Sequence, residues 1–131
     1  MLMLRRETRA ERRRRRGGPA AADKAASAAE VEAAIAAACG ALADLCWGNV
    51  DNTTALRKQS GTSMLLVLCE HRAASVRAAA TRAIWNCVVS DDKMGEQLRE
   101  QHGLDTIVKL LSDTDTEVLA NAAGIMETLI V

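Results

Sequence analysis

The stretch TTALRKQSG at residues 53–61 recurs as GEQLREQHG at residues 95–103, 42 positions further along the chain. Four of the nine aligned positions are identical, namely the Leu, the Arg, the Gln and the final Gly. The same offset, without a gap, places LLVLC at residues 65–69 on IVKLL at residues 107–111, and the apolar pattern is kept. A sequence period of about 40 to 47 residues is typical of stacked helical repeats. We therefore predict a chain of repeated helical units.

Each period is predicted to hold three helices in the order short, short and long. Asp91 and Asp92 are suited to cap a first helix of about nine residues. That helix is expected to end at Gly103, where a left-handed turn costs glycine little, and Gly61 occupies the same place one period earlier.

The second and third helices follow from the remaining pattern. A second helix is expected over residues 104–111, before the helix-breaking run at 112–115. Thr114 and Glu117 then form a candidate capping box for the longer third helix. The predicted core face of the second helix is made of Ile107, Val108 and Leu111.

Composition favours helix throughout the chain. The 131 residues include no Phe, no Tyr and one Pro, so burial depends mainly on Ala and Leu, which form helices readily. We predict an all-α solenoid of about two and a third 42-residue repeats, with units near residues 38–79 and 80–121, a partial unit at 122–131 and an Ala-rich lead-in helix at 23–38. No apolar run approaches the ~18 to 20 residues that a membrane-spanning helix needs.

The N-terminal 22 residues differ from the rest in charge. Residues 1–22 hold eight Arg and two acidic residues, whereas residues 23–131 hold nine basic and fifteen acidic residues. The net charge of zero is thus the sum of a basic arm and an acidic body. The arm is predicted to be disordered. Most basic runs of this kind are solvated tails, so binding of the arm to nucleic acid, an acidic partner or an import receptor is only a secondary hypothesis. Glu7 and Glu11 argue against a transit peptide, because such peptides are poor in acidic residues.

The three-helix order, the period and the Gly at the first bend resemble the armadillo repeat over residues 32–131. The phrases CGALADL at 39–45 and AIWNC at 83–87 are similar to the third-helix signature of that family. The resemblance implies a concave groove lined by the third helices, with an Asn that holds an extended peptide. Asn86 stands at the Asn position, with Asp44 and Thr128 at the equivalent places. The Trp that nuclear-import adaptors carry four residues earlier is replaced by Gly40, Arg82 and Gly124, which argues against binding of nuclear-localisation signals.

The third helix of the middle repeat is the candidate binding surface. Helical spacing puts positions 80, 83, 84 and 87 on one face, which we predict to be core. Arg82, Trp85, Asn86 and Val89 fall on the opposite face, and the resemblance implies that the first three line the groove. An aromatic and an Arg at this spacing suit a binding hot spot. The alternative is that Trp85 covers the junction with a neighbouring repeat, while Trp47 is expected to pack against the loop at 49–52.

The leading functional hypothesis is a non-enzymatic protein-binding module or scaffold. Two phrases, at residues 83–87 and 117–121, are most similar to armadillo repeats of the ciliary outer dynein arm docking machinery, which implies an axonemal assembly as partner. The alternatives are a nuclear-transport or nucleic-acid-associated adaptor acting through the Arg-rich arm, or a truncated fragment without its own activity. We expect a cytoplasmic location, which could extend to the cilium.

Catalytic, metal and cofactor chemistry are not expected. Neither His71 nor His102 has a Ser or Cys at a recognisable motif spacing. The four cysteines lack the paired C-x-x-C spacing of a zinc site. Cys46, Cys69 and Cys87 stand where the repeat requires apolar residues, so buried free thiols in a reducing compartment are predicted.

Self-association is expected through the last helix. The helix predicted over residues 117–131 is not followed by a polar capping helix in this sequence, and a stack usually needs about three repeats for stability. Its expected exposed apolar residues are Val118, Ile125, Leu129 and Ile130.

Overall fold

The computed structural model describes residues 6–12 and 19–130. The chain divides into two compact units, Met1–Val31 and Glu32–Val131. All regular structure among the described residues is helical. The prediction of an all-α solenoid is therefore confirmed, and the second unit contains the repeats.

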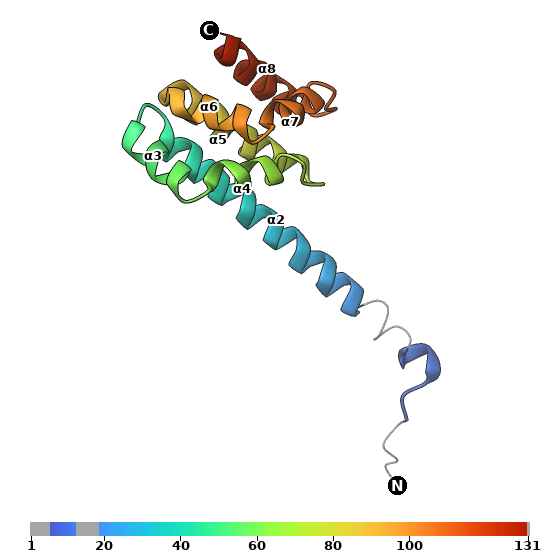
Figure 1. Ribbon diagram of the computed structural model, residues 1–131. Coiled ribbons are helices and arrows are strands. Elements are labelled where there is room, and N and C mark those ends of the chain that lie inside the picture. The colour runs from blue at the N-terminus through green and yellow to red at the C-terminus, as the bar shows by residue number, and fades with distance from the viewer. Residues whose placement is uncertain (1–5, 13–18, 131) are drawn as a thin grey trace. The chain divides into compact units, whose positions relative to one another are not determined.

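The helices of the second unit follow the 42-residue period at every start. Figure 1 shows them stacked in succession, with α8 at the C-terminal end. Because α3, α4 and α5 each begin 42 residues before α6, α7 and α8, the unit contains two complete three-helix repeats, preceded by the C-terminal part of α2 as a lone third helix. The helices are α2 (Pro19–Cys46), α3 (Val50–Lys58), α4 (Gly61–Leu68), α5 (Ala74–Ser90), α6 (Asp92–Glu100), α7 (Gly103–Leu110) and α8 (Thr116–Ile130).

The N-terminal arm is more helical than expected. The predicted disorder of residues 1–22 falls partly on residues 1–5 and 13–18, which lie outside the described residues. Residues 9–12 form a helical turn, in which the Thr8 N–H donates to Glu11 Oε2 (2.7 Å) and the Glu11 N–H donates to Thr8 Oγ1 (3.1 Å). The lead-in helix begins at Pro19 rather than residue 23, since a proline is readily accepted in the first turn of a helix.

The prediction that glycines supply the left-handed turns was wrong. At these two bends the residues with positive φ are Ser60 (62°) and His102 (57°), each one position before the glycine. Gly61 and Gly103 instead begin α4 and α7, where an added Cβ would run into the side chain and carbonyl of the leucine at the end of the first helix. These glycines allow close packing of two short helices at the bend.

The second helix and the following cap also differ from expectation. In α7 the buried residues are Gly103, Ile107 and Leu110, whereas Val108 and Leu111 are exposed. The start of α8 is capped by Asp115, whose Oδ1 accepts from the N–H groups of residues 117 and 118 (both 3.0 Å), and not by the Thr114–Glu117 box. Asp115 is the capping residue because it lies directly before the first helical residue, the position at which a side chain can accept from the free N–H groups of the first turn.

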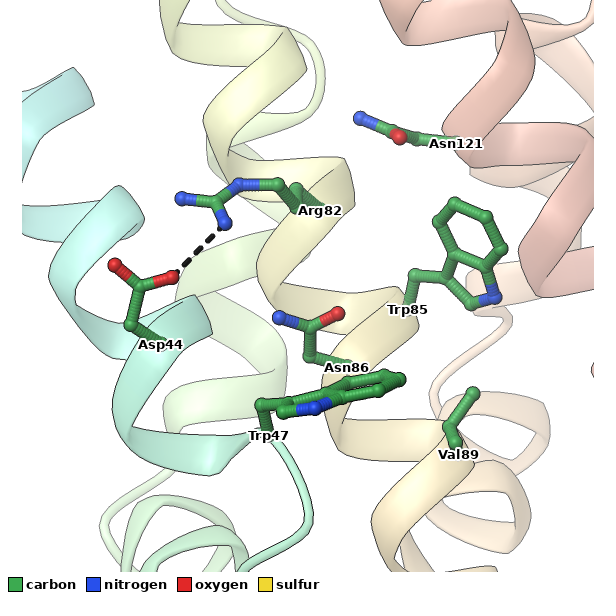
Figure 2. Close-up of a pocket in the computed structure, with 7 residues that line it drawn as sticks. All are labelled: Asp44, Trp47, Arg82, Trp85, Asn86, Val89 and Asn121. Carbon is green, nitrogen blue, oxygen red and sulfur yellow. Dashed lines mark hydrogen bonds and ion pairs between the residues drawn. The ribbon is translucent and has the colours of Figure 1, made fainter.

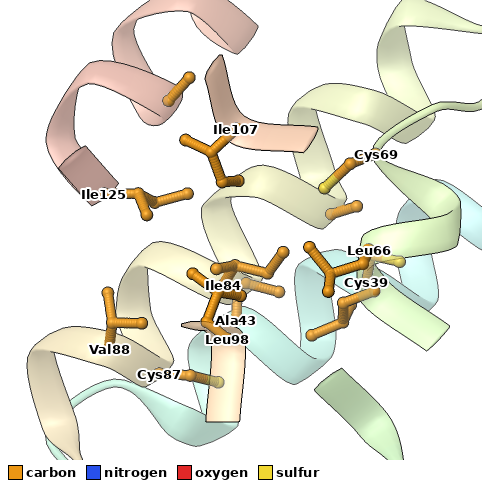
Figure 3. Packing of buried hydrophobic residues seen from close by; sticks show 14 of the residues in the cluster. Cys39, Ala43, Leu66, Cys69, Ile84, Cys87, Val88, Leu98, Ile107 and Ile125 are labelled. Atoms are coloured by element: carbon orange, nitrogen blue, oxygen red, sulfur yellow. The ribbon is translucent and has the colours of Figure 1, made fainter. Parts of the chain in front are cut away.

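The long helix α5 is the centre of the core. Its predicted core positions 80, 83, 84 and 87 are all fully buried, which confirms the face assigned from helical spacing. Ile84 belongs to one buried cluster with residues from α2, α4, α6, α7 and α8 (Figure 3). The predicted exposure of Val118 and Ile125 on α8 was wrong, because both point into this core and are fully buried.

A partly buried ion pair ties the middle repeat to the next. Arg77 on α5 donates through Nε to Asp113 Oδ2 (2.8 Å) and through Nη2 to Asp113 Oδ1 (3.1 Å). The same guanidinium donates through Nη1 to the carbonyls of His71 and Arg72 (3.0 and 2.9 Å). One arginine therefore fixes the loop before α5 and the loop before α8.

Candidate partner-binding groove

A cavity of about 640 Å³ opens between the C-terminal end of α2, the outward face of α5 and α8. Figure 2 shows Arg82, Trp85, Asn86 and Val89 projecting into it from α5. We call this cavity the groove. Its lining residues are Asp44, Trp47, Arg82, Trp85, Asn86, Val89 and Asn121.

One wall of the groove carries an ion pair. Arg82 Nη1 donates to Asp44 Oδ1 (3.0 Å) and Arg82 Nη2 donates to the Gly40 carbonyl (3.3 Å). An added Cβ at Gly40 would lie 3.4 Å from Nη2, which is an ordinary contact distance. The two charges cancel within the pair, so the groove offers polar groups without a net charge.

Asn86 connects the middle third helix to the preceding one. Its Nδ2 donates to the Ala43 carbonyl (2.8 Å), and one turn later the Ser90 hydroxyl donates to the Cys46 carbonyl (2.9 Å). The bond through Nδ2 fixes the amide and leaves its side-chain carbonyl oxygen as an acceptor.

Trp85 lies at the junction between two repeats and also lines the groove. Its indole lies so close to Gly124 on α8 that an added Cβ there would overlap the six-membered ring. The same indole packs against the core and lines the groove. Trp85 therefore covers the junction between α5 and α8 and leaves part of its surface open to the groove.

The sequence interpretation missed Trp47 as a groove residue. Trp47 follows the end of α2 and is 62% exposed, and Figure 2 shows its indole reaching from α2 toward Val89. Its expected packing against the loop at 49–52 stays a prediction. The signal was available, because Trp47 lies three residues after Asp44, as Val89 lies three residues after Asn86.

The structure does not bring Thr128 into the groove. Thr128 lines a separate cavity of about 310 Å³ with residues of α6, and its hydroxyl donates to the Gly124 carbonyl (2.9 Å). The polar residue that α8 contributes to the groove is Asn121, whose Nδ2 donates to the Ala78 carbonyl (3.1 Å) and to Thr81 Oγ1 (3.2 Å). Asn121 has no Asn one period earlier, so the repeat alignment gave no signal for it.

Metal-ligating clusters are absent from the part of the chain that the structure describes. The same residues contain no helix that is long and apolar enough to cross a membrane. The four cysteines are buried free thiols, as predicted for Cys46, Cys69 and Cys87. Burial raises the pKa of the Cys69 thiol to about 12 and also raises the pKa of Cys39 and Cys87. These thiols are therefore protonated and shielded at neutral pH.

The buried thiols should make the fold sensitive to alkali. The pKa of Cys69 rises from 9.0 in the ordinary thiol to about 12 in the fold, so the folded state holds this proton more tightly than the unfolded state. The resulting stability is complete below about pH 9 and is lost as the pH rises toward 12. Denaturant unfolding at a series of pH values should show this decline, and Cys69→Ala should make it shallower. An equal decline in the variant would contradict the assignment.

Comparisons with known proteins support the fold. No protein-family model and no curated protein matches the chain. Among solved structures it is similar to an engineered protein of the Northeast Structural Genomics Consortium, with a TM-score of 0.68 and 27% identity over 71% of this chain and 38% of that one. It is also similar to a designed armadillo repeat protein, with a TM-score of 0.62 and 27% identity over 68% of this chain and 37% of that one.

The architecture is accordingly that of an armadillo-type α-solenoid, a fold that generally mediates protein binding. A second engineered protein from the same consortium matches with a TM-score of 0.66 and 25% identity over 70% of this chain and 22% of the other. The matched region spans less than two fifths of each of these solved chains.

Proposed function

We propose that the chain is a non-enzymatic protein-binding module that holds an extended or helical segment of its partner in the groove. The observation that carries the proposal is the convergence of two indoles and a fixed amide on one cavity. Indoles supply large apolar contact areas, and the amide supplies the directional hydrogen bond that sets the register of a peptide. The neutral Arg82–Asp44 pair favours a partner segment that has apolar anchors rather than a high charge.

An axonemal dynein docking assembly is the first specific partner to test. The proposal rests on the two phrases at residues 83–87 and 117–121. The second candidate, an adaptor that binds nucleic acid through the Arg-rich arm, predicts binding that falls steeply with salt. A groove that is neutral overall predicts binding that depends little on salt.

Replacing Trp47 by Ala should weaken a groove ligand by about 2 kcal/mol, because a truncated aromatic anchor loses most of its contact area. Extended peptides selected from a random library on the full chain provide the ligand, and titration calorimetry measures the loss. Because Trp47 is largely exposed, the free energy of unfolding should stay unchanged. Trp85→Ala should weaken binding and also destabilise the fold, since it leaves Gly124 uncovered.

Val67→Ala is the matched control for Trp47→Ala, because Val67 is an exposed apolar residue of α4 away from the groove. The control should bind peptides as the wild type does. Selected peptides that bind Trp47→Ala and the wild type equally would show that the groove is not the binding site. Loss of binding on deleting residues 1–22, with Trp47→Ala unaffected, would point to the arm instead.

A further inference from the structure

The two indoles of the groove are held in different ways. Trp85 is half-buried and packs against the core and Gly124. Trp47 is largely exposed and directly follows the last residue of α2. A side chain with so little packing around it depends on its backbone for its direction. The place of Trp47 in the groove is therefore set by the turn at residues 46–49, which joins α2 to α3.

This turn depends on a left-handed glycine. Gly48, the residue after Trp47, has a φ of 62°. A Cβ added to it would meet nothing within 4 Å, so the glycine is required for its backbone conformation and not for close packing. A different φ at this residue would redirect the chain next to Trp47.

Local hydrogen bonds hold the side of the turn that faces α2 and α3. The Trp47 N–H donates to the Ala43 carbonyl (3.1 Å). Asn52, in the first turn of α3, donates through Nδ2 to the Leu45 carbonyl (2.6 Å). All of these residues lie within ten positions of one another in the sequence, so their bonds shape the turn but do not fix it against α5.

Ser90, the last residue of α5, supplies the bond to that helix. The Gly48 N–H donates to Ser90 Oγ (2.9 Å). The hydroxyl proton of Ser90 lies within reach of the carbonyls of Cys46 (2.9 Å) and Asn86 (2.7 Å). Gly48 and Ser90 are 42 residues apart and thus occupy equivalent positions in successive repeats. One half-buried hydroxyl therefore joins the turn that carries Trp47 to the helix that carries the rest of the groove.

We propose that Ser90 is a positioning residue of the groove, which holds the turn at residues 46–49 so that Trp47 faces the ligand in a fixed direction. Ser90 does not line the cavity itself and acts through Trp47. An indole that is fixed before binding does not have to be ordered by the ligand, and this preorganisation raises affinity. The proposal rests on the groove being the binding site, as proposed above.

Fluorine NMR tests the positioning in the absence of any ligand. The chain contains two tryptophans, so protein prepared with 5-fluorotryptophan should give one resonance for each, and Trp47→Phe assigns them. In Ser90→Ala the Trp47 resonance should narrow and shift toward its position in the unfolded chain, whereas the Trp85 resonance should stay in place. Ser90→Thr keeps the hydroxyl and should keep the wild-type spectrum.

Ser63→Ala is the matched control, because it removes a serine hydroxyl that bonds to Gln101 (2.8 Å) on an exposed surface away from the groove. Gly48→Ala is a second test variant, since it disturbs the turn through φ and leaves every hydroxyl in place. It should loosen Trp47 as Ser90→Ala does. A Trp47 resonance that is unchanged in both Ser90→Ala and Gly48→Ala would overturn the proposal.

Titration calorimetry with peptides selected on the full chain tests the consequence for binding. Ser90→Ala should weaken these peptides about 2- to 10-fold, the range expected when one more side chain must be ordered on binding. The loss should be smaller than that in Trp47→Ala. Weaker binding by Trp47→Ala with unchanged binding by Ser90→Ala would overturn the positioning role and leave the groove as the site. Unchanged binding by both variants would overturn the proposed function itself.

Discussion

Replacing Arg77 by Met should lower the free energy of unfolding by about 3 kcal/mol, because it leaves the partly buried carboxylate of Asp113 without its arginine partner. The side chains of Arg77 and Asp113 are only 17% and 9% exposed. The variant also deprives the carbonyls of His71 and Arg72 of their donor. Denaturant unfolding followed by circular dichroism measures the loss.

Arg82→Met is the matched control, because it removes an arginine from an exposed ion pair with Asp44. Exposed pairs contribute about 0 to 1 kcal/mol, so this variant should be nearly as stable as the wild type. Equal losses in the two variants would contradict the structural role of Arg77.

The same pair makes an acid-side prediction. Hydrogen bonds from Arg77 are the main cause that lowers the pKa of Asp113. The fold therefore gains stability from the ionised carboxylate above about pH 4, and this gain is lost as the pH falls below that value. In Arg77→Met the acid-side decline in stability should be smaller.

Replacing Gly124 by Ala should destabilise the protein by about 1 to 3 kcal/mol, the cost of overpacking a filled interior. The direction of this change in stability is informative, because replacing Gly by Ala inside a helix ordinarily stabilises a protein by about 1 kcal/mol. Here the new methyl group would overlap the indole of Trp85, a rigid ring held between α5 and α8.

Gly40→Ala provides the control at the equivalent position of α2, two periods earlier. Its nearest neighbour is the end of the flexible Arg82 side chain, at 3.4 Å from the added Cβ. This variant should be neutral or stabilised. In a Trp85→Ala background the penalty of Gly124→Ala should disappear, which a double-mutant cycle would detect. A penalty that persists without the indole would exclude the proposed overlap.

Much of the fold could be predicted because the sequence is repeated, so that each helix boundary is indicated by two copies of the same pattern. The offset between residues 53–61 and 95–103 fixed the number and order of helices, and helical spacing identified the buried face of α5. The errors occurred where two helices meet. A glycine can be required because its φ is positive or because a Cβ would not fit. At Gly103 the second reason holds, since Leu98 lies too close for a Cβ. The repeat in the sequence does not reveal this distance.

The groove could be anticipated on the helix that carries most of it, and less well elsewhere. Positions on α5 share one helical face, so the sequence placed Arg82, Trp85 and Asn86 together. Trp47 lies just beyond the end of α2, where helical spacing no longer fixes a direction. The contact between Trp85 and Gly124 joins residues of two different repeats. Such a contact can be identified only from the three-dimensional stacking of the repeats.

The location of both tryptophans in the groove has a spectroscopic consequence. The chain contains no Tyr and no Phe, and Trp47 and Trp85 line the same cavity. All of its intrinsic fluorescence and its near-ultraviolet aromatic absorption therefore come from groove residues. Light emitted by the native protein therefore reports on the groove itself, without background from any other aromatic side chain.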